Sequence, residues 1–454
     1  MNGANHRETW NSRAGFVLAA AGSAVGLGNI WAFPNQVASN GGAAFLLVYL
    51  LCCFTIGYPL MIAELTIGRH TKSNPVGAFR AIIPGNKIYP LIGFWGVICG
   101  VGIHAFYNVI AGWTLGYVFE ELTYAIGATT LNHILADLSH GPKNALFSLL
   151  FMLATVYIVA NGVRSGIEKA TKTIMPALVL ILIAMIFFVI FQDGAHQGLS
   201  LYLQPDLSKI NPELVLSALG QAFFSLSLGI GTLITYGSYL DNRQNIPKAA
   251  AYVTGADISI AFLAGFLIIP AMFVAQHAGI PIFDNNGNLI SSTGLVFDTL
   301  PNLFHIMGPA GIILGIFFFI LLSLAALTST ISLLEVPVAY LVDEWGIRRK
   351  RATIGIALFG TILSLLVAYN PRSIEILVKI FLNIGLPIGG LMICLFLGFV
   401  WKTRLALQEL EKGRPGILTS SFARIWPLFV KILCPATILL VFLNTIGALQ
   451  WLFL

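Results

Sequence analysis

Long apolar stretches, separated by short polar loops, occupy most of the chain. A helix that crosses a bilayer needs about 20 predominantly apolar residues. Eleven stretches approximately meet this requirement, at 13–36, 41–68, 88–119, 145–161, 173–192, 214–236, 249–279, 309–342, 352–369, 376–401 and 427–450. The pattern therefore predicts an all-α polytopic membrane protein with eleven transmembrane helices, and the longer helices are expected to tilt.

The composition supports a membrane protein and excludes several other classes. Of the 454 residues, 57% are apolar and 10% are charged, whereas about 25% of the residues of a soluble domain are charged. The net charge of +6 comes from 25 basic residues, which are too dispersed for a nucleic-acid-binding surface. The five cysteines lie in apolar stretches without a CxxC or Cys/His pattern, so neither a disulfide framework nor a zinc site is predicted.

The distribution of basic residues predicts the orientation in the membrane. If the polar tail 1–12 is cytoplasmic, twenty Lys and Arg residues fall on that side. Only four fall on the other side: Lys143, Lys209, Arg372 and Lys379. This bias follows the positive-inside rule, and an odd number of spans then places the C-terminus outside. The tail does not resemble a cleavable signal peptide. The absence of N-x-[ST] sites favours a bacterial plasma membrane.

Two of the predicted spans contain a glycine pair near the middle of the membrane, at 26–28 (GLG) and 229–231 (GIG). Small polar residues flank both pairs: Ser23, Asn29, Ser225 and Ser227. Glycine weakens a helix by about 1 kcal/mol relative to alanine and lets the backbone unwind. Close helix packing through small residues would explain one such pair. Two interrupted helices at matching positions in two halves indicate the midplane binding site of a transporter.

The spacing of the two interruptions predicts an internal repeat. They are five spans apart, and an odd number of spans per repeat requires the two halves to be inverted. The predicted organisation is a cytoplasmic tail (1–12), a first five-helix repeat (13–192), an extracellular linker (193–213), a second repeat (214–401), a cytoplasmic loop (402–426) and an eleventh helix (427–454).

Three carboxylates fall inside apolar spans, where such groups are costly and usually functional. Glu64 and Glu335 are expected to accept hydrogen bonds from unwound backbone. Asp257 is either a structural, protonated residue or a cation ligand. The eighth span is rich in hydroxyls, which either bond to carbonyls one turn earlier or bind a hard cation: Ser323, Thr328, Ser329, Thr330 and Ser332.

Six ordered segments resemble the neurotransmitter:sodium symporter family, whose fold is that of the leucine transporter. The most specific are AGSAVGLGNIWAFP, NGGAAFLLVYL and GYPLMIAELTIGR. FYNVIAGWTLGY, GQAFFSLSLGIGTLITYGSYL and LTSTISLLEVPVAYLVDE support them, and the resemblance covers nearly the whole chain. It implies a transporter rather than an enzyme, with broken helices one and six.

The resemblance also implies two sodium sites and a substrate site. The first sodium site would use Ala24, Asn29, Ser225, Asp257 and the substrate carboxylate. The second would use Gly22, Val25, Ala325, Thr328 and Ser329. The substrate carboxylate would meet the amides near Gly26 and Gly28 and the hydroxyl of Tyr107. The substrate amine would meet carbonyls near Phe224 and Ser227, and Ala24 and Ser225 would also contact the substrate. Its side chain would lie among Ile103, Phe224, Ile230, Ser329 and Leu333.

The gates can be assigned in the same way. Tyr107 and Phe224 would cover the substrate, and the inner gate would comprise Arg7, Trp10, Ser238, Tyr239 and Asp343. The charged pair that forms the outer gate in the family is absent, because Ala32 and Val378 occupy its positions. The outer gate would then close without an ion pair or through Glu375 and Lys379.

Asp257 marks a second departure, because it replaces the usual asparagine of span seven. Ala261 occupies the position of the carboxylate that serves chloride-independent members. Asp257 would supply that negative charge itself, and chloride is not expected to be required.

These observations and the resemblance predict a symporter that works by alternating access. It would couple the transport of a hydrophobic amino acid to sodium, with two sodium ions per substrate. The alternatives are a non-transporting amino-acid sensor of the same fold and a symporter of another zwitterionic solute. An intramembrane aspartyl protease is disfavoured because only a loose GxGD echo, TGAD at 254–257, is present.

Overall fold

The computed structural model describes residues 8–127, 141–283, 289 and 295–448, and the described part is almost entirely helical. The first half comprises α1 (Arg13–Ala24), η1 (Gly28–Ala32), α2 (Phe33–Ser39), α3 (Ala43–Cys52), η2 (Cys53–Gly57), α4 (Tyr58–Thr71), α5 (Pro75–Ile82), α6 (Pro90–Ala125), α8 (Gly141–Ala160), η3 (Val163–Glu168) and α9 (Lys169–Val189). The segment before the second half contains α10 (Ala195–Leu203) and η4 (Leu207–Lys209).

The second half begins with α11 (Pro212–Ser225), α12 (Thr232–Ser238), α13 (Ile246–His277), η5 (Leu295–Thr299), α15 (Leu300–Ile306) and α16 (Gly308–Trp345). It continues with α17 (Arg349–Tyr369), α18 (Ser373–Leu377), η6 (Val378–Ile384), α19 (Gly385–Leu395), η7 (Phe396–Lys402), α20 (Thr403–Glu411), η8 (Ile417–Thr419), α21 (Ser421–Leu428), η9 (Phe429–Leu433) and α22 (Cys434–Thr445).

The described residues contain nine helices that are long and apolar enough to span a membrane, or ten if the bent pair Arg13–Ala24 and Gly28–Ser39 counts as one span. The predicted number of eleven is therefore not confirmed. The predicted span 214–236 consists of α11, with 14 residues, and α12, with 7 residues, and each is too short alone. The non-helical segment between them contains Gly229 and Gly231, just as the 53° bend in the first span falls at Gly26 and Gly28.

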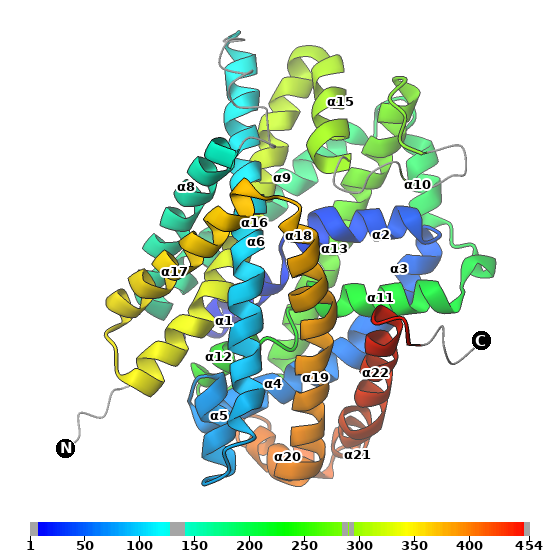
Figure 1. The fold of residues 1–454 in the computed structure, drawn as a ribbon. Helices are drawn as coiled ribbons and strands as arrows, with labels where there is room; N and C mark the ends of the chain where they lie inside the picture. Colours follow the sequence, from blue (N-terminus) through cyan, green and yellow to red (C-terminus); the bar gives the residue numbers. More distant parts are fainter. Residues whose placement is uncertain (1–7, 128–140, 284–288, 290–294, 449–454) are drawn as a thin grey trace.

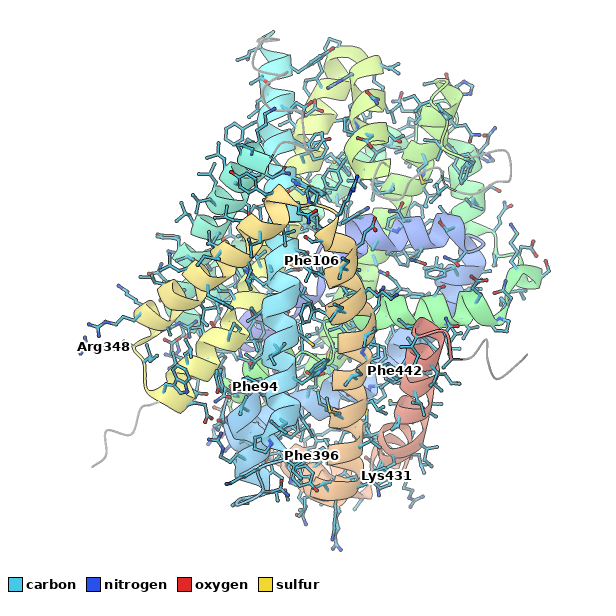
Figure 2. The ribbon with its side chains drawn as sticks, viewed as in Figure 1. Phe94, Phe106, Arg348, Phe396, Lys431 and Phe442 are labelled. Atoms are coloured by element: carbon cyan, nitrogen blue, oxygen red, sulfur yellow. The ribbon has the colours of Figure 1, made fainter. Side chains whose placement is uncertain are left out.

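The helices form one bundle around the two interrupted spans (Figure 1). Helix α6 packs along α16, while α8 and α17 lie together on one flank. Most of the buried apolar side chains form one large core, to which Phe106 of α6 belongs. Phe94, near the start of α6, is 41% exposed (Figure 2). All five cysteines are buried and free, as the sequence predicts.

The outer surface of the bundle is apolar over large areas. Leu51, Tyr157 and Phe187 are all more than 60% exposed. A soluble protein rarely exposes extended apolar surface, whereas a bilayer covers such side chains at no cost. The bundle is therefore built for a membrane, with its polar groups gathered inside.

Candidate functional site

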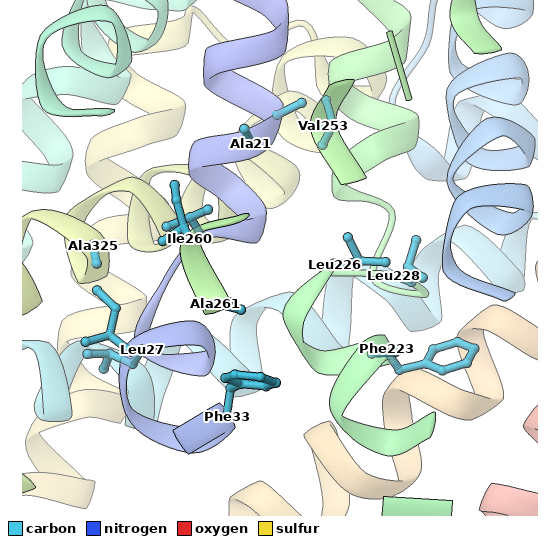
Figure 3. Packing of buried hydrophobic residues seen from close by; sticks show 14 of the residues in the cluster. Ala21, Leu27, Phe33, Phe223, Leu226, Leu228, Val253, Ile260, Ala261 and Ala325 are labelled. Carbon is cyan, nitrogen blue, oxygen red and sulfur yellow. The ribbon is translucent and has the colours of Figure 1, made fainter. Parts of the chain in front are cut away.

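The first span is interrupted between α1 and η1, and Leu27 lies at this interruption (Figure 3). Two backbone amides there donate to side chains. The amide of Gly26 donates to Oδ1 of Asn29 at 3.1 Å, and the amide of Leu27 donates to the hydroxyl of Tyr107 at 3.0 Å. A Cβ atom on Gly26 would lie 2.3 Å from Oγ of Ser329 and 2.6 Å from the Tyr107 hydroxyl. Glycine is required here because the unwound backbone lies directly against other helices.

The second interruption separates α11 from α12, and it is held open by backbone angles that favour glycine. Gly229 and Gly231 have φ values of +85° and +77°, and Ser227 has +52°. The amide of Gly229 donates to Oε1 of Glu64 at 2.8 Å. Glu64 therefore accepts from unwound backbone, as the sequence predicts, and replaces the helical partner that this amide lost.

A buried polar cluster lies beside the first interruption. Asp257, Asn29 and Ser225 are each 0% exposed. Asp257 accepts from Nδ2 of Asn29 at 2.7 Å and from Oγ of Ser225 at 2.8 Å. Tyr49 donates to Oγ of Ser225 at 3.1 Å and lies 3.4 Å from Oδ2 of Asp257. All three groups that surround the carboxylate are neutral, and no described Lys, Arg or His pairs with it.

The amide orientation of Asn29 differs from that of a cation ligand. Its oxygen accepts from Gly26, and its nitrogen faces Asp257. Rotation of the amide by half a turn would exchange the two atoms and present the oxygen to an ion.

A second group of oxygen atoms lies where α16 passes the first interruption. The hydroxyl of Thr328 donates to the carbonyl of Ala325 at 2.8 Å and to that of Val25 at 3.2 Å. A Cβ atom on Gly22 would lie 3.3 Å from Cβ of Thr328, so the two helices are in close contact. The structure thus brings together Gly22, Val25, Ala325 and Thr328 from segments about 300 residues apart.

Two cavities lie between the interrupted helices. The inner cavity has a volume of about 30 Å³ and is lined by Ser23, Ala24, Gly26, Gly28, Ile103, Tyr107, Phe224, Ser227, Ile230, Ser329, Ser332, Leu333 and Leu386. These residues include all predicted substrate contacts except Ser225, which lies in the Asp257 cluster. A larger cavity of about 490 Å³ adjoins it. Tyr107, Phe224 and Leu386 line both cavities and so form the partition between them.

The larger cavity contains the two positions that the sequence predicts at the outer gate. Ala32 and Val378 both line it, together with Ile374 and Leu382. Glu375 and Lys379 are exposed and do not belong to its lining. The walls that face each other across this cavity near Ala32 are therefore mainly apolar.

At the other end of the molecule, the predicted inner-gate residues are only partly brought together. Trp10 donates from Nε1 to the carbonyl of Tyr236 at 3.0 Å, and its amide donates to the carbonyl of Tyr239 at 3.2 Å. Asp343 accepts from the amide of Asn74 at 2.8 Å. Ser238 donates within its own helix, to the carbonyl of Thr235 at 2.5 Å. Arg7 lies outside the described residues.

The expectation that Glu335 serves unwound backbone is wrong. Glu335 is 0% exposed and forms an ion pair with Arg349, and it also accepts from the hydroxyl of Tyr239 at 2.7 Å. Sequence inspection missed Arg349 because it lies at the start of α17, within a run of basic residues that looks like an ordinary solvated loop. A basic partner compensates the cost of a buried carboxylate, and the position of Glu335 in an apolar span was the available signal.

Three further residues of the site were not predicted. Gln221 donates to the carbonyl of Gly28 at 2.9 Å, Tyr49 contacts the Asp257 cluster, and Leu386 separates the two cavities. Gln221 lies one helical turn before Ser225, on the same face of α11, and this spacing could have indicated it. Leu386 has no comparable signal, because it lies in the tenth predicted span and reaches the site only through the packing of that span against the interrupted helices.

The fold and this site define a secondary transporter, in which two discontinuous helices meet around buried polar groups in the middle of the membrane. Comparison with known proteins identifies the family. The sequence profile of the Sodium:neurotransmitter symporter family matches residues 7–145 and 139–452, and the chain belongs to this family. Its members are sodium-coupled transporters and not enzymes.

Individual relatives agree with this assignment. A sodium-dependent transporter of Bacillus subtilis (strain 168) is 34% identical over 97% of this chain and 98% of its own length. A sodium-dependent transporter of Haemophilus influenzae is 33% identical over 97% of this chain and 98% of its own. The crystal structure of MhsT in complex with L-phenylalanine has a TM-score of 0.83 and 40% sequence identity, and covers 97% of this chain and 100% of MhsT.

Proposed function

We propose that this protein is a symporter that couples the uptake of a hydrophobic amino acid to the entry of two sodium ions, without a requirement for chloride. The observation that carries the proposal is the buried Asp257 carboxylate, which contacts only neutral groups among the described residues. An isolated buried charge is costly, and a bound cation would compensate it. Carboxylate, amide and hydroxyl oxygens suit a hard cation such as sodium.

The assignment of the ion sites follows from the two oxygen clusters. The first sodium ion would bind among Ala24, Asn29, Ser225, Asp257 and the substrate carboxylate. The second would bind among the carbonyls of Gly22, Val25 and Ala325 and the hydroxyls of Thr328 and Ser329. Because the substrate carboxylate would itself be a sodium ligand, neither sodium nor substrate would bind well alone, and this is a coupling free energy between sites.

The choice of a hydrophobic amino acid rests on the inner cavity. Its apolar wall comprises Ile103, Phe224, Ile230, Leu333 and Leu386. Among the described residues, no carboxylate lines this cavity. A substrate that carries an amine but no carboxylate would therefore find no counter-charge there. The relative MhsT was crystallised in complex with L-phenylalanine, and its overall similarity supports a substrate of the same class.

The orientation follows from the basic residues. The end of the molecule that carries α5 and α20 would face the cytoplasm, and the 490 Å³ cavity would open to the outside. A tenfold sodium gradient supplies about 1.4 kcal/mol per ion, and a potential of 100 mV adds about 2.3 kcal/mol per charge. Two ions with a zwitterion would supply about 7 kcal/mol, sufficient for roughly a 10⁵-fold substrate gradient.

The direct test is uptake into proteoliposomes under an inward sodium gradient, with a panel of labelled amino acids from glycine to phenylalanine. We expect sodium-stimulated accumulation of apolar amino acids, with little uptake of glycine and unchanged rates when gluconate replaces chloride. A protein that binds an amino acid but transports none would be a sensor. Uptake that requires chloride would contradict the role given to Asp257.

The Asp257→Asn variant tests the ion site itself. We expect it to weaken sodium activation by at least tenfold or to make uptake dependent on chloride, because the compensating negative charge is lost. The matched control is Asp206→Asn, since Asp206 is exposed in the segment between the two halves. Unchanged sodium activation and chloride response in Asp257→Asn would remove this residue from the site.

A further inference from the structure

A third cavity, unrelated to the transport pathway, lies at the end of the molecule that carries α5 and α20. It has a volume of about 560 Å³ and is lined by His70, Ala81, Ile82, Ile83, Val400, Trp401, Lys402, Leu405, Gln408, Glu409 and Lys412. One wall comes from the end of α4 and from α5, and the other comes from η7 and α20. None of these residues lines either cavity between the interrupted helices.

The charged groups of this cavity have an excess of positive charge. Its one carboxylate in the lining, Glu409, is 2% exposed. The carboxylate accepts from Nε of Arg69 at 2.8 Å, from Nδ1 of His70 at 3.1 Å and from Nζ of Lys412 at 2.6 Å. Arg69 is itself fully buried, so Glu409 is already neutralised from within the protein. The ammonium of Lys412, which is 51% exposed, and that of Lys402 remain at the cavity.

Lys402 has an unusual backbone at the edge of the cavity. Its φ of +69° lies in a region that non-glycine residues avoid, and it joins η7 to α20. No described carboxylate pairs with its ammonium. Such conformations persist only where the surroundings impose them, and they concentrate at ligand sites.

Most of the remaining lining of the cavity is apolar. Ile82, Ile83, Val400 and Leu405 form the apolar wall, and Leu405 is 46% exposed. Trp401 packs against His70 with ring centroids 4.9 Å apart, and a tryptophan at this level is typical of the membrane interface. Phe396 and Lys431 are labelled near the lower end of the bundle in Figure 2. Val400, which lines the cavity, follows Phe396 by four residues in the sequence.

From this arrangement we propose that the cavity binds one anionic phospholipid of the surrounding bilayer. Its phosphate lies against Lys402 and Lys412, and the first part of an acyl chain covers Val400 and Leu405. Basic pockets at the membrane boundary between helices recognise anionic headgroups, and a volume of about 560 Å³ suits a ligand of that size. The lipid would fasten α20 to α4 and α5, segments that are more than 300 residues apart in sequence.

The test is native mass spectrometry of the full-length protein released from micelles that contain matched phosphatidylglycerol and phosphatidylcholine. We expect one retained phosphatidylglycerol per protein and at least tenfold less retained phosphatidylcholine. The double variant Lys402→Gln/Lys412→Gln should retain about tenfold less phosphatidylglycerol, because each basic residue near the membrane surface attracts an anionic lipid by about 1 kcal/mol.

The matched control is Lys350→Gln/Arg351→Gln, which removes two exposed basic residues that do not line the cavity. It should retain the lipid, and gel filtration together with thermal melting should show that both double variants are folded. Equal retention of both lipids, an equal loss in the control, or full displacement of the lipid by millimolar inorganic phosphate would overturn the proposal. The readout is binding and not transport, so it is decided separately from the proposed symport.

Discussion

At the scale of single residues, the site depends on positions where a side chain is absent. Gly26 is the clearest case, because its missing Cβ leaves room for Ser329 and Tyr107 and for the free amides of the interruption. The Gly26→Ala variant should fold but lose at least tenfold in sodium-dependent uptake, since the methyl group would displace the groups proposed to bind substrate and sodium. Uptake in proteoliposomes checks this.

The control for Gly26→Ala is Gly355→Ala in α17, where an added Cβ meets nothing within 4 Å. That variant should transport normally and be slightly more stable, because alanine favours the helix by about 1 kcal/mol. If Gly26→Ala transported as well as Gly355→Ala, the interruption would not be the binding site.

Glu335 and Arg349 illustrate the opposite case, a residue that requires a partner. Glu335→Gln leaves Arg349, whose side chain is only 18% exposed, without its counter-charge. Breaking such a pair from one side costs about 3–5 kcal/mol, so thermal melting in detergent should show a clear loss. The double variant Glu335→Gln/Arg349→Gln should lose less than the sum of the two single variants.

A partly exposed pair provides the comparison, because Arg80 is 55% exposed and pairs with Glu344, whose side chain is 13% exposed. Glu344→Gln should change stability by about 1 kcal/mol or less. Equal destabilisation by Glu335→Gln and Glu344→Gln would mean that burial of the ion pair contributes nothing.

At the scale of elements, α15 is attached to the end of α6 by a titratable contact. His305 lies 3.3 Å from Oε2 of Glu121 and stacks on Tyr124 with ring centroids 4.2 Å apart. The hydrogen bond to Glu121 raises the pKa of His305, and the charge of Glu120 adds to this effect. A raised pKa in the folded state stabilises the contact at low pH, and this stabilisation is lost as the pH rises through the folded pKa.

We therefore expect α15 to be better protected from amide hydrogen exchange at pH 6 than at pH 9, after correction for the intrinsic exchange rates. His305→Gln should abolish this pH dependence, whereas His277→Gln, a change of the exposed histidine at the end of α13, should leave it intact. A pH dependence that persists in His305→Gln would assign it to other groups.

The elements that the sequence predicts correctly are those whose signal is local. The glycine pairs predict the two interruptions, because a residue without Cβ is required by the backbone itself. By contrast, the roles of Arg349 and Leu386 depend on which helices pack together, and neither residue differs from its neighbours in sequence. The same limit explains the span count, since α11 and α12 have the composition of one span but not its continuous helix.

At the scale of the whole molecule, the proposed alternating access requires the larger cavity between the interrupted helices to close over the substrate. The walls near Ala32 and Val378 are mainly apolar, so closure would mostly bury apolar surface instead of forming an ion pair. Val378→Asp should slow uptake by tenfold or more, because each closure would bury an unpaired carboxylate. Adding Ala32→Arg to this variant should restore much of the rate, since the two charges would then compensate each other.

The single variant Ala32→Arg provides the third corner of this cycle and should also be slow. Rescue in the double variant would show that positions 32 and 378 meet when the transporter closes, although both line an open cavity here. The rescued transporter should in addition become sensitive to ionic strength, because an ion pair at the edge of an aqueous cavity is screened by salt, whereas the apolar closure of the natural protein is not. Val378→Asp with a normal rate would mean that this position stays hydrated throughout the cycle, and additive losses in the double variant would mean that the two positions never come together.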